Sequence, residues 1–175
     1  MQYDRKITIC TAGSRKAAYW PAQELYLAEL WEKLKVPARG TETMAEYLAM
    51  KKPRQDELKD VGGYVAGTLE NGRRKAAAVT GRDIITLDLD NVPPALGCGY
   101  CAYSTRKHSP AAPRLRVLIP TDRTVSADEY EPLARKTASY IDPSMKVFDP
   151  STFEASRLMY WPSCCSDGGY IYQQE

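Results

Sequence analysis

The chain has 175 residues, a hydrophobic content of 43% and a formal net charge of +2. This composition provides for a sizeable core, and it excludes a disordered chain and a uniformly basic surface. No apolar run approaches the roughly 20 residues that cross a bilayer, and the first residues lack the apolar segment of a secretory signal. We therefore expect residues 1–175 to form one domain of cytoplasmic localisation.

The first half of the chain predicts a strand and two helices. Residues 7–10 favour a short strand, and apolar residues at helical spacing predict a helix over 22–34. Thr43 and Glu46 have capping-box spacing at the start of a second helix, 42–50.

A hairpin is predicted next, around Asn71 and Gly72, because this dipeptide is a strong signal for a tight turn. Residues 64–69 favour a strand before the turn, and residues 73–79 favour its partner strand after the turn.

The second half predicts three strands, one helix and a final extended segment, and Pro120 is expected to stop the third strand. These elements are 84–90, 101–105, 115–119, a helix from the N-cap Ser126 to about Tyr140, and 156–161. Strands and helices do not alternate strictly. We therefore expect an α+β domain with a mainly antiparallel sheet.

The strand 84–90 ends in Asp88 and Asp90. Alternate side chains of a strand share a face, so both carboxylates project together while the leucines between them point to the opposite side. Carboxylate oxygens suit magnesium or manganese. The alternative is a solvated strand end before a turn at Pro93 and Pro94.

Two further patterns bear on chemistry. His108 is the one histidine of the chain and follows a predicted strand among basic residues. In that position it is suited to bind phosphate, and the alternative is an ordinary exposed side chain.

Cys98 and Cys101 have zinc-site spacing, and Cys164 with Cys165 would complete four ligands. Adjacent cysteines are awkward tetrahedral ligands, so we expect buried thiols and keep structural zinc as the alternative.

The order of these motifs resembles that of a known superfamily. An Asp-x-Asp strand, a Ser-to-His segment, an Arg-x-Arg strand and a later hydrophobic-Asp step occur at 88–90, 104–108, 114–116 and 148–149. This arrangement resembles the archaeo-eukaryotic primase superfamily.

Longer strings are similar to a narrower group, the primase-polymerase domains of phages and mobile elements. These domains lie ahead of a helicase in virulence-associated protein E-like replication proteins. The strings that carry the similarity are 59–65, 72–75, 86–90, 103–105 and 153–163.

The resemblance implies a primase fold, in which a small N-terminal α/β unit packs on a module like an RNA-recognition motif. The active site would lie in the cleft between them. It also implies that residues 1–175 are the N-terminal part of a larger replication protein.

The resemblance assigns three catalytic residues, Asp88, Asp90 and Asp149, as ligands of Mg²⁺ or Mn²⁺. For Asp149 the alternatives are a turn residue before Pro150 and a different alignment that would use Asp142.

The resemblance also implies phosphate-binding residues. Those for the nucleotide are Ser104, His108, Arg114, Arg116 and Arg157. Arg157 has a structural ion pair with one of the acids as its alternative. Arg73 and Arg74 are assigned to template phosphates, with a solvated turn as the alternative. Arg106 and Lys107 stand where many members carry small residues.

The implied activity is template-directed nucleotidyl transfer in phage or mobile-element DNA replication. A 3′-hydroxyl attacks the α-phosphorus, and two cations about 4 Å apart stabilise the entering and leaving oxygens. The implied partners are a single-stranded DNA template, nucleoside triphosphates and a helicase domain or subunit. Two alternatives are a non-catalytic DNA-binding replication-initiation module attached to a helicase, and a metal-dependent nuclease.

Overall fold

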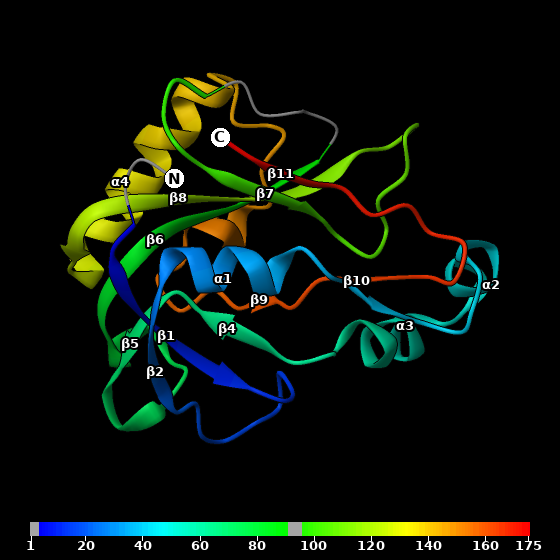
Figure 1. The fold of residues 1–175 in the computed structure, drawn as a ribbon, viewed down its shortest axis with the longest axis horizontal. Coiled ribbons are helices and arrows are strands. Elements are labelled where there is room, and N and C mark those ends of the chain that lie inside the picture. The colour runs from blue at the N-terminus through cyan, green and yellow to red at the C-terminus, as the bar shows by residue number, and fades with distance from the viewer. Residues whose placement is uncertain (1–3, 91–95) are drawn as a thin grey trace.

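The computed structural model of the protein describes residues 4–90 and 96–175. The fold is α+β and its two main sheets are antiparallel, as the sequence predicts (Figure 1). The predicted turn at Pro93 and Pro94 lies outside the described residues. Within these ranges no helix has the length and apolar character needed to cross a membrane.

The larger sheet carries the acidic strand in its interior, one place from an edge. Its five strands run in the order β11-β7-β8-β6-β5, and every pairing is antiparallel. The strands are β5 (Gly67–Leu69), β6 (Val79–Asp90), β7 (Cys101–Ser104), β8 (Arg114–Val125) and β11 (Tyr172–Gln174).

The smaller sheet combines strands from both ends of the chain. Its order is β2-β1-β4-β9, and its strands are β1 (Lys6–Ala12), β2 (Ala22–Tyr26), β4 (Gly63–Val65) and β9 (Met159–Tyr160). A separate parallel pair joins β3 (Ala38–Arg39) to β10 (Ser163–Cys164). The segment around β9 and β10 therefore ties the end of the chain to its beginning.

Both faces of the larger sheet are covered (Figure 1). On one face α4 (Ala127–Ile141) packs over the alternating side chains of β6, together with the short helix η3 (Pro150–Phe153). On the other face α1 (Leu27–Leu34) and the smaller sheet close a second core. Each face of β6 is thus committed to a core until its last residues, where the acids emerge.

Two short helices form a projecting unit at one end of the molecule (Figure 1). They are α2 (Met44–Ala49) and α3 (Lys52–Lys59). The capping box predicted at Thr43 and Glu46 is present. The buried Tyr47 side chain joins the two helices, because its hydroxyl donates to the carbonyl of Gln55 at 3.1 Å.

An ion pair between Glu42 and Arg106 docks this unit on the larger sheet. The two side chains are only 10% and 3% exposed. Burial raises the pKa of Glu42, but the hydrogen bond and the charge of Arg106 outweigh it and leave the pKa below its ordinary value. Arg106, which lies between Ser104 and His108 in the chain, therefore makes a structural contact.

The predicted helix 22–34 is wrong over its first part. Residues 22–26 form β2, because they pair along the whole of β1, from Lys6 opposite Tyr26 to Cys10 opposite Ala22. The helix α1 begins at Leu27 and keeps the predicted end. Pairing with β1 therefore determines the conformation of residues 22–26, although their apolar residues have helical spacing.

The predicted hairpin is also more complex than its sequence signal. Residues 64–69 are divided between β4 and β5, which belong to different sheets. Asn71 and Gly72 do adopt positive φ angles, of 52° and 62°. Residues 73–78 are not a strand, because η1 (Glu70–Gly72) and η2 (Ala76–Ala78) lengthen the turn, and β6 starts only at Val79.

Two strand ends differ from prediction as well. Pro120 does not stop β8, because the strand continues to Val125 through a shift of register against β6 at Ile84. The predicted extended segment 156–161 contains only the short β9. The predicted helix from Ser126 is confirmed, and Ser126 accepts the Glu129 amide as its cap.

We predict that Arg106→Met lowers the free energy of unfolding by about 3 kcal/mol or more, because it leaves the Glu42 carboxylate buried without a partner. Urea denaturation near neutral pH measures the loss. The difference from wild type should shrink as the pH falls below neutrality, because Arg106→Met removes the contact that lowers the pKa of Glu42 and leaves the burial that raises it, so protonation removes the unpaired charge of the variant first.

The matched control is Arg123→Met. Arg123 pairs with Glu129 at the surface, where the side chains are 59% and 42% exposed. Such pairs contribute under about 1 kcal/mol, so equal losses in the two variants would contradict the role given to Arg106.

Candidate functional site

The two acids of β6 lie where the sequence predicts. Leu87 and Leu89 are buried in the core beneath α4, and the alternation of the strand places Asp88 and Asp90 on the opposite face. Asp88 has a side chain 15% exposed and Asp90 one 55% exposed. Asp88 therefore lies at the floor of the site and Asp90 at its rim.

Asp149 joins these acids through the backbone. The Asp90 amide donates to the Val147 carbonyl at 2.8 Å, and the Asp149 amide donates to the Asp88 carbonyl at 3.4 Å. Phe148, between them, is buried against the core. The segment thus runs antiparallel to the end of β6 and brings the third predicted carboxylate to the first. The alternative acid, Asp142, accepts hydrogen bonds from Ser144 in its own turn.

Each oxygen of Asp88 faces an arginine. Arg116, opposite Asp88 in the β6–β8 register, places Nε 2.9 Å from Oδ1. Arg157 places Nη2 2.8 Å from Oδ2. Burial lowers the pKa of Arg116, but the charge of Asp88 outweighs it and holds the pKa above its ordinary range. The guanidinium is therefore permanently charged.

Arg157 also reaches the third acid. The same Nη2 atom lies 3.1 Å from Oδ2 of Asp149. Burial raises the pKa of Asp149, but hydrogen bonds from Ser151 and the charge of Arg157 outweigh it and lower the pKa overall. The Asp149 carboxylate is therefore charged near neutral pH, and it points at the same cationic atom as the Asp88 carboxylate.

The outermost pair is looser. Arg114 Nη2 lies 3.5 Å from Asp90 Oδ2, and both side chains are about half exposed, at 43% and 55%. An exposed pair of this kind contributes little and exchanges readily with solvent ions.

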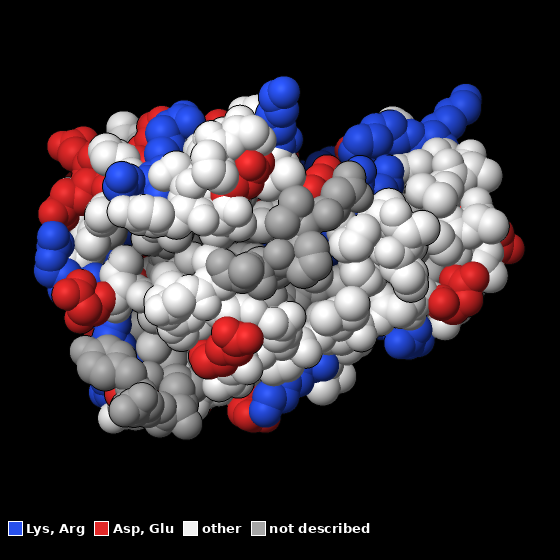
Figure 2. Space-filling model, turned by 90° about the horizontal axis from the view of Figure 1, so that it is seen from above, with Lys and Arg blue, Asp and Glu red and all other residues white. Residues whose placement is uncertain are grey.

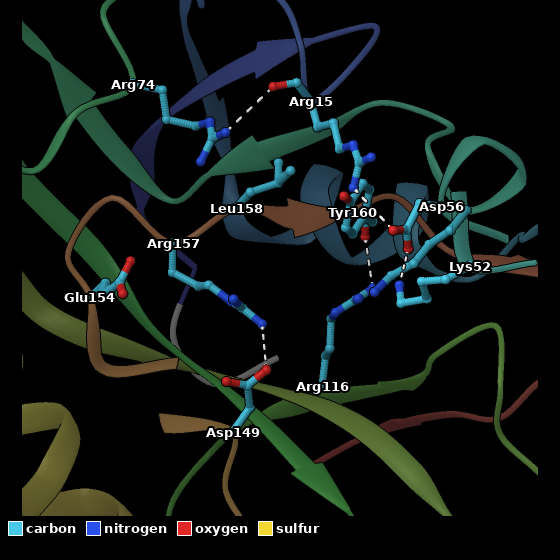
Figure 3. Close-up of a pocket in the computed structure, with 11 residues that line it drawn as sticks. Arg15, Lys52, Asp56, Arg74, Arg116, Asp149, Glu154, Arg157, Leu158 and Tyr160 are labelled. Carbon is cyan, nitrogen blue, oxygen red and sulfur yellow. Dashed lines mark hydrogen bonds and ion pairs between the residues drawn. The ribbon is translucent and has the colours of Figure 1, made fainter. Parts of the chain in front are cut away.

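These residues lie in a cleft that we call the basic cleft. Seen from above, Lys and Arg side chains stand on both sides of a notch in the surface (Figure 2). Three adjoining hollows share lining residues and form the cleft, and the first of them has a volume of about 350 Å³ (Figure 3). The charged residues that line the three hollows together are Arg15, Lys52, Asp56, Lys59, Arg74, Asp88, Asp90, Arg106, Lys107, Arg114, Arg116, Asp149, Glu154 and Arg157.

Lys59 is the residue that all three hollows share. It ends α3, and its ammonium lies 4.9 Å from the centre of the Tyr160 ring. Burial, with help from the nearby Arg116 charge, lowers the pKa of Lys59 to about 8. Sequence reasoning missed this residue, because its helix has a weak apolar pattern. The available signal was Pro53 at the first turn of a helix.

One wall of the cleft is built by Arg74 and Arg15. The Arg74 guanidinium lies 5.2 Å from the Trp20 ring centre, and its Nη2 donates to the Arg15 carbonyl at 3.4 Å. The Arg15 guanidinium lies 3.8 Å from the Asp56 carboxylate (Figure 3). Arg73, the other residue predicted to contact DNA, is exposed and does not line the cleft. Arg15 was missed, since its loop carries no motif.

Ser104 and His108 are not among the residues that line the cleft. Ser104 is buried, and its hydroxyl accepts the Ile171 amide at 3.0 Å. His108 is also buried, and Nδ1 accepts the Arg114 amide at 3.1 Å. Burial lowers the pKa of His108, which favours the neutral ring that such acceptance requires. His108 therefore shapes the loop before Arg114.

The cysteines give a mixed result. Four are buried as expected and Cys98 is exposed, so that part of the expectation is wrong. Burial raises the pKa of Cys101 to about 12, which disfavours the thiolate that binds metals.

The acids fit a divalent cation in part. Oxygens of Asp88 and Asp149 converge on one cationic atom, and Asp90 lines the same hollow. Hard oxygen donors suit Mg²⁺ or Mn²⁺. With the side chains in this arrangement, no three His, Cys, Asp or Glu within residues 4–90 and 96–175 are grouped to hold a metal ion. Asp88 and Asp149 would therefore form the inner ligands, and Asp90 an outer one.

We predict that anion binding in the basic cleft weakens between about pH 7 and about pH 9, because Lys59 loses its charge as the pH rises through a pKa near 8. Sulfate is a suitable probe, since it does not titrate in this range, and calorimetry gives its affinity. Lys59→Arg keeps the charge and should remove the pH dependence. An equal decline in wild type and Lys59→Arg would contradict the assignment.

Comparison with known protein families gives a match over the whole chain. The family model described as the VapE N-terminal domain matches residues 1–175. Neither the curated proteins nor the solved structures contain a significant match. The match confirms the resemblance to the N-terminal part of virulence-associated protein E-like replication proteins and indicates a role in replication-associated proteins. The chain belongs to the family of VapE N-terminal domains.

Proposed function

We propose that this domain is a nucleotidyltransferase of the archaeo-eukaryotic primase type, a primase or polymerase that copies a single-stranded template. One observation carries the proposal. Asp88 and Asp149, from segments far apart in the chain, aim their carboxylates at one point on the floor of a cationic cleft.

The wider architecture supports the same proposal. The cleft lies between the larger sheet, which supplies Asp88 and Arg116, and elements near the smaller sheet, which supply Arg15 and Tyr160. An acid-bearing sheet that faces a second α/β unit across a cleft is the arrangement that the primase resemblance implies. We propose that the larger sheet corresponds to the module like an RNA-recognition motif.

The acids supply the metal site of the proposed reaction. Asp88, Asp90 and Asp149 would hold Mg²⁺ or Mn²⁺, and the ions when bound would stabilise the entering and leaving oxygens at the α-phosphorus. Arg116 stays on Asp88 and fixes the orientation of this carboxylate. The buried pair therefore aims the other Asp88 oxygen at the cleft.

The cations divide the cleft into two arms around the acids. Lys59, Lys107 and Arg114 line the arm beside the β7–β8 loop, together with Thr105. We propose that this arm binds the triphosphate of the incoming nucleotide. His108 acts there indirectly, through its hydrogen bond to the Arg114 backbone.

The other arm suits a nucleic-acid strand. Its lining has six cationic residues against three acidic ones, namely Arg15, Lys52, Lys59, Arg74, Arg116 and Arg157 against Asp56, Asp149 and Glu154. A groove with a cationic excess follows a phosphate backbone without reading its sequence. We propose that a single-stranded DNA template lies along this wall, and that a helicase domain or subunit supplies it.

A specific observation favours the second candidate, a non-catalytic DNA-binding module. Both oxygens of Asp88 are already paired with Arg116 and Arg157, which is how acids stabilise a fold without metal. In that case DNA would bind without regard to metal or nucleotide. Calorimetry with Mn²⁺ and a nucleoside triphosphate separates the two, because metal-dependent nucleotide binding supports the enzyme. A nuclease would instead cut single-stranded DNA with metal alone.

We predict that Asp90→Asn lowers incorporation of labelled nucleotides on a single-stranded template by about a hundredfold, the order expected for loss of one electrostatic contact to a transition state. The assay contains Mg²⁺ or Mn²⁺. Asp90 is the best first variant, because its side chain is 55% exposed and its removal leaves no buried charge unpaired. The double variant Asp88→Ala, Asp90→Ala should be inactive.

Asp122→Asn is the matched control, since Asp122 is an exposed acid of β8 outside the cleft. If wild type incorporates nucleotides and the double variant does so equally well, the acids are not the metal ligands.

We predict that Arg15→Gln combined with Arg74→Gln weakens binding of a single-stranded oligonucleotide. The slope of log affinity against log salt should fall by about 1.4, because each lost phosphate contact on a single strand contributes about 0.7. Fluorescence anisotropy over a salt series measures both quantities. Lys136→Gln, on the exposed side of α4, is the control. An unchanged salt slope in the double variant would place the strand elsewhere.

A further inference from the structure

The position of Arg157 has a consequence for how the site loads. Its Nη2 atom lies 2.8 Å from an oxygen of Asp88 and 3.1 Å from an oxygen of Asp149. A divalent cation that bridges the same two carboxylates needs the same point, since magnesium and manganese bind carboxylate oxygens directly. One positive nitrogen and one metal ion cannot share it.

The two arginines on Asp88 differ in how firmly they are held. Arg116 is 5% exposed, lies within the ladder of β8 and donates to the Tyr160 carbonyl at 3.2 Å. Arg157 is 26% exposed and follows η3 in a turn outside any strand. Arg116 is therefore a fixed partner, and Arg157 is the one that can leave.

The contacts of Arg157 also leave its guanidinium incompletely satisfied. Its Nη1 atom bonds to the Ser151 hydroxyl and its Nη2 atom to the two acids. Its Nε atom is buried and has no hydrogen-bond partner within the described part of the chain. An unpaired buried donor lowers the cost of a move to another acceptor.

The surroundings determine the destination of the displaced side chain. Arg157 lines both the hollow of the three acids and the hollow of Arg15 and Arg74, so a change of rotamer keeps it in the basic cleft. Once a metal neutralises the acids, the positive charges of Lys59 and Arg116 remain in the cleft, and a bound anion balances them. Phosphate oxygens accept a guanidinium bidentately.

We infer that Arg157 holds the place of the divalent cation in the metal-free site and is transferred to phosphate when the cation binds. This inference rests on the proposed function. Metal and phosphate then bind cooperatively, because each favours the position of Arg157 that the other requires, and the coupling is reciprocal. Arg157 is a positioning residue in this scheme, and it prevents repulsion between Asp88 and Asp149 before the metal arrives.

The test compares wild type with Arg157→Gln in two binding measurements that need no turnover. Binding of Mn²⁺ alone should become about tenfold tighter in the variant, the order of a charge-assisted hydrogen bond, because no guanidinium has to leave. Binding of pyrophosphate at saturating Mn²⁺ should become about tenfold weaker, because the released arginine is missing. Arg157→Lys keeps the charge but not the two parallel donors of the guanidinium, so its affinities for Mn²⁺ and pyrophosphate should lie between those of wild type and Arg157→Gln. Arg123→Gln should change neither.

The opposite signs separate this inference from a structural role. If Arg157 only supported the fold, its loss would weaken both measurements, and that result would overturn the inference. Equal Mn²⁺ affinity in wild type and Arg157→Gln also overturns it, while the metal site of the proposed function stands. If folded wild type and folded Arg157→Gln both fail to bind Mn²⁺, the proposed function fails with it.

Discussion

The buried ion pair between Asp88 and Arg116 is the interaction on which the rest of the structure depends. The two residues are opposite each other in the β6–β8 ladder, and Arg116 also donates to the carbonyl of Tyr160 in β9. This guanidinium therefore joins the larger sheet to the smaller one. A charge at this depth is stable only with a partner, so the packing of the sheets fixes where the Asp88 carboxylate points.

From this pair outward the charges of the site become steadily more exposed. Arg157 on Asp88 and Asp149 is partly exposed, and Arg114 on Asp90 is about half exposed. The inner pair is fixed, whereas the outer ones can exchange partners with metal ions or phosphates, because solvent screening weakens them. A site of this kind keeps its geometry while its contents change. That property suits the reaction we propose, in which metal, nucleotide and strand bind together.

Much of the fold follows from short-range patterns. The alternation of β6 and the capping boxes at Thr43 and Ser126 are local, and the structure confirms them. The sequence predictions are wrong where pairing with a distant segment determines the local conformation. Residues 22–26 have helical spacing but pair with β1, and Pro120 lies inside a strand because β8 shifts its register against β6. Propensity is a weak prior that such pairing overrides.

The candidate site divides in the same way. The sequence by itself determined that Asp88 and Asp90 share a face, since strand geometry alternates side chains, and its resemblance to the archaeo-eukaryotic primase superfamily pointed to Asp149. Only the tertiary structure decided that Lys59 and Arg15 line the cleft and that His108 is buried behind Arg114. The physical reason is that alternation acts over a few residues, whereas the meeting of charges depends on how distant segments pack.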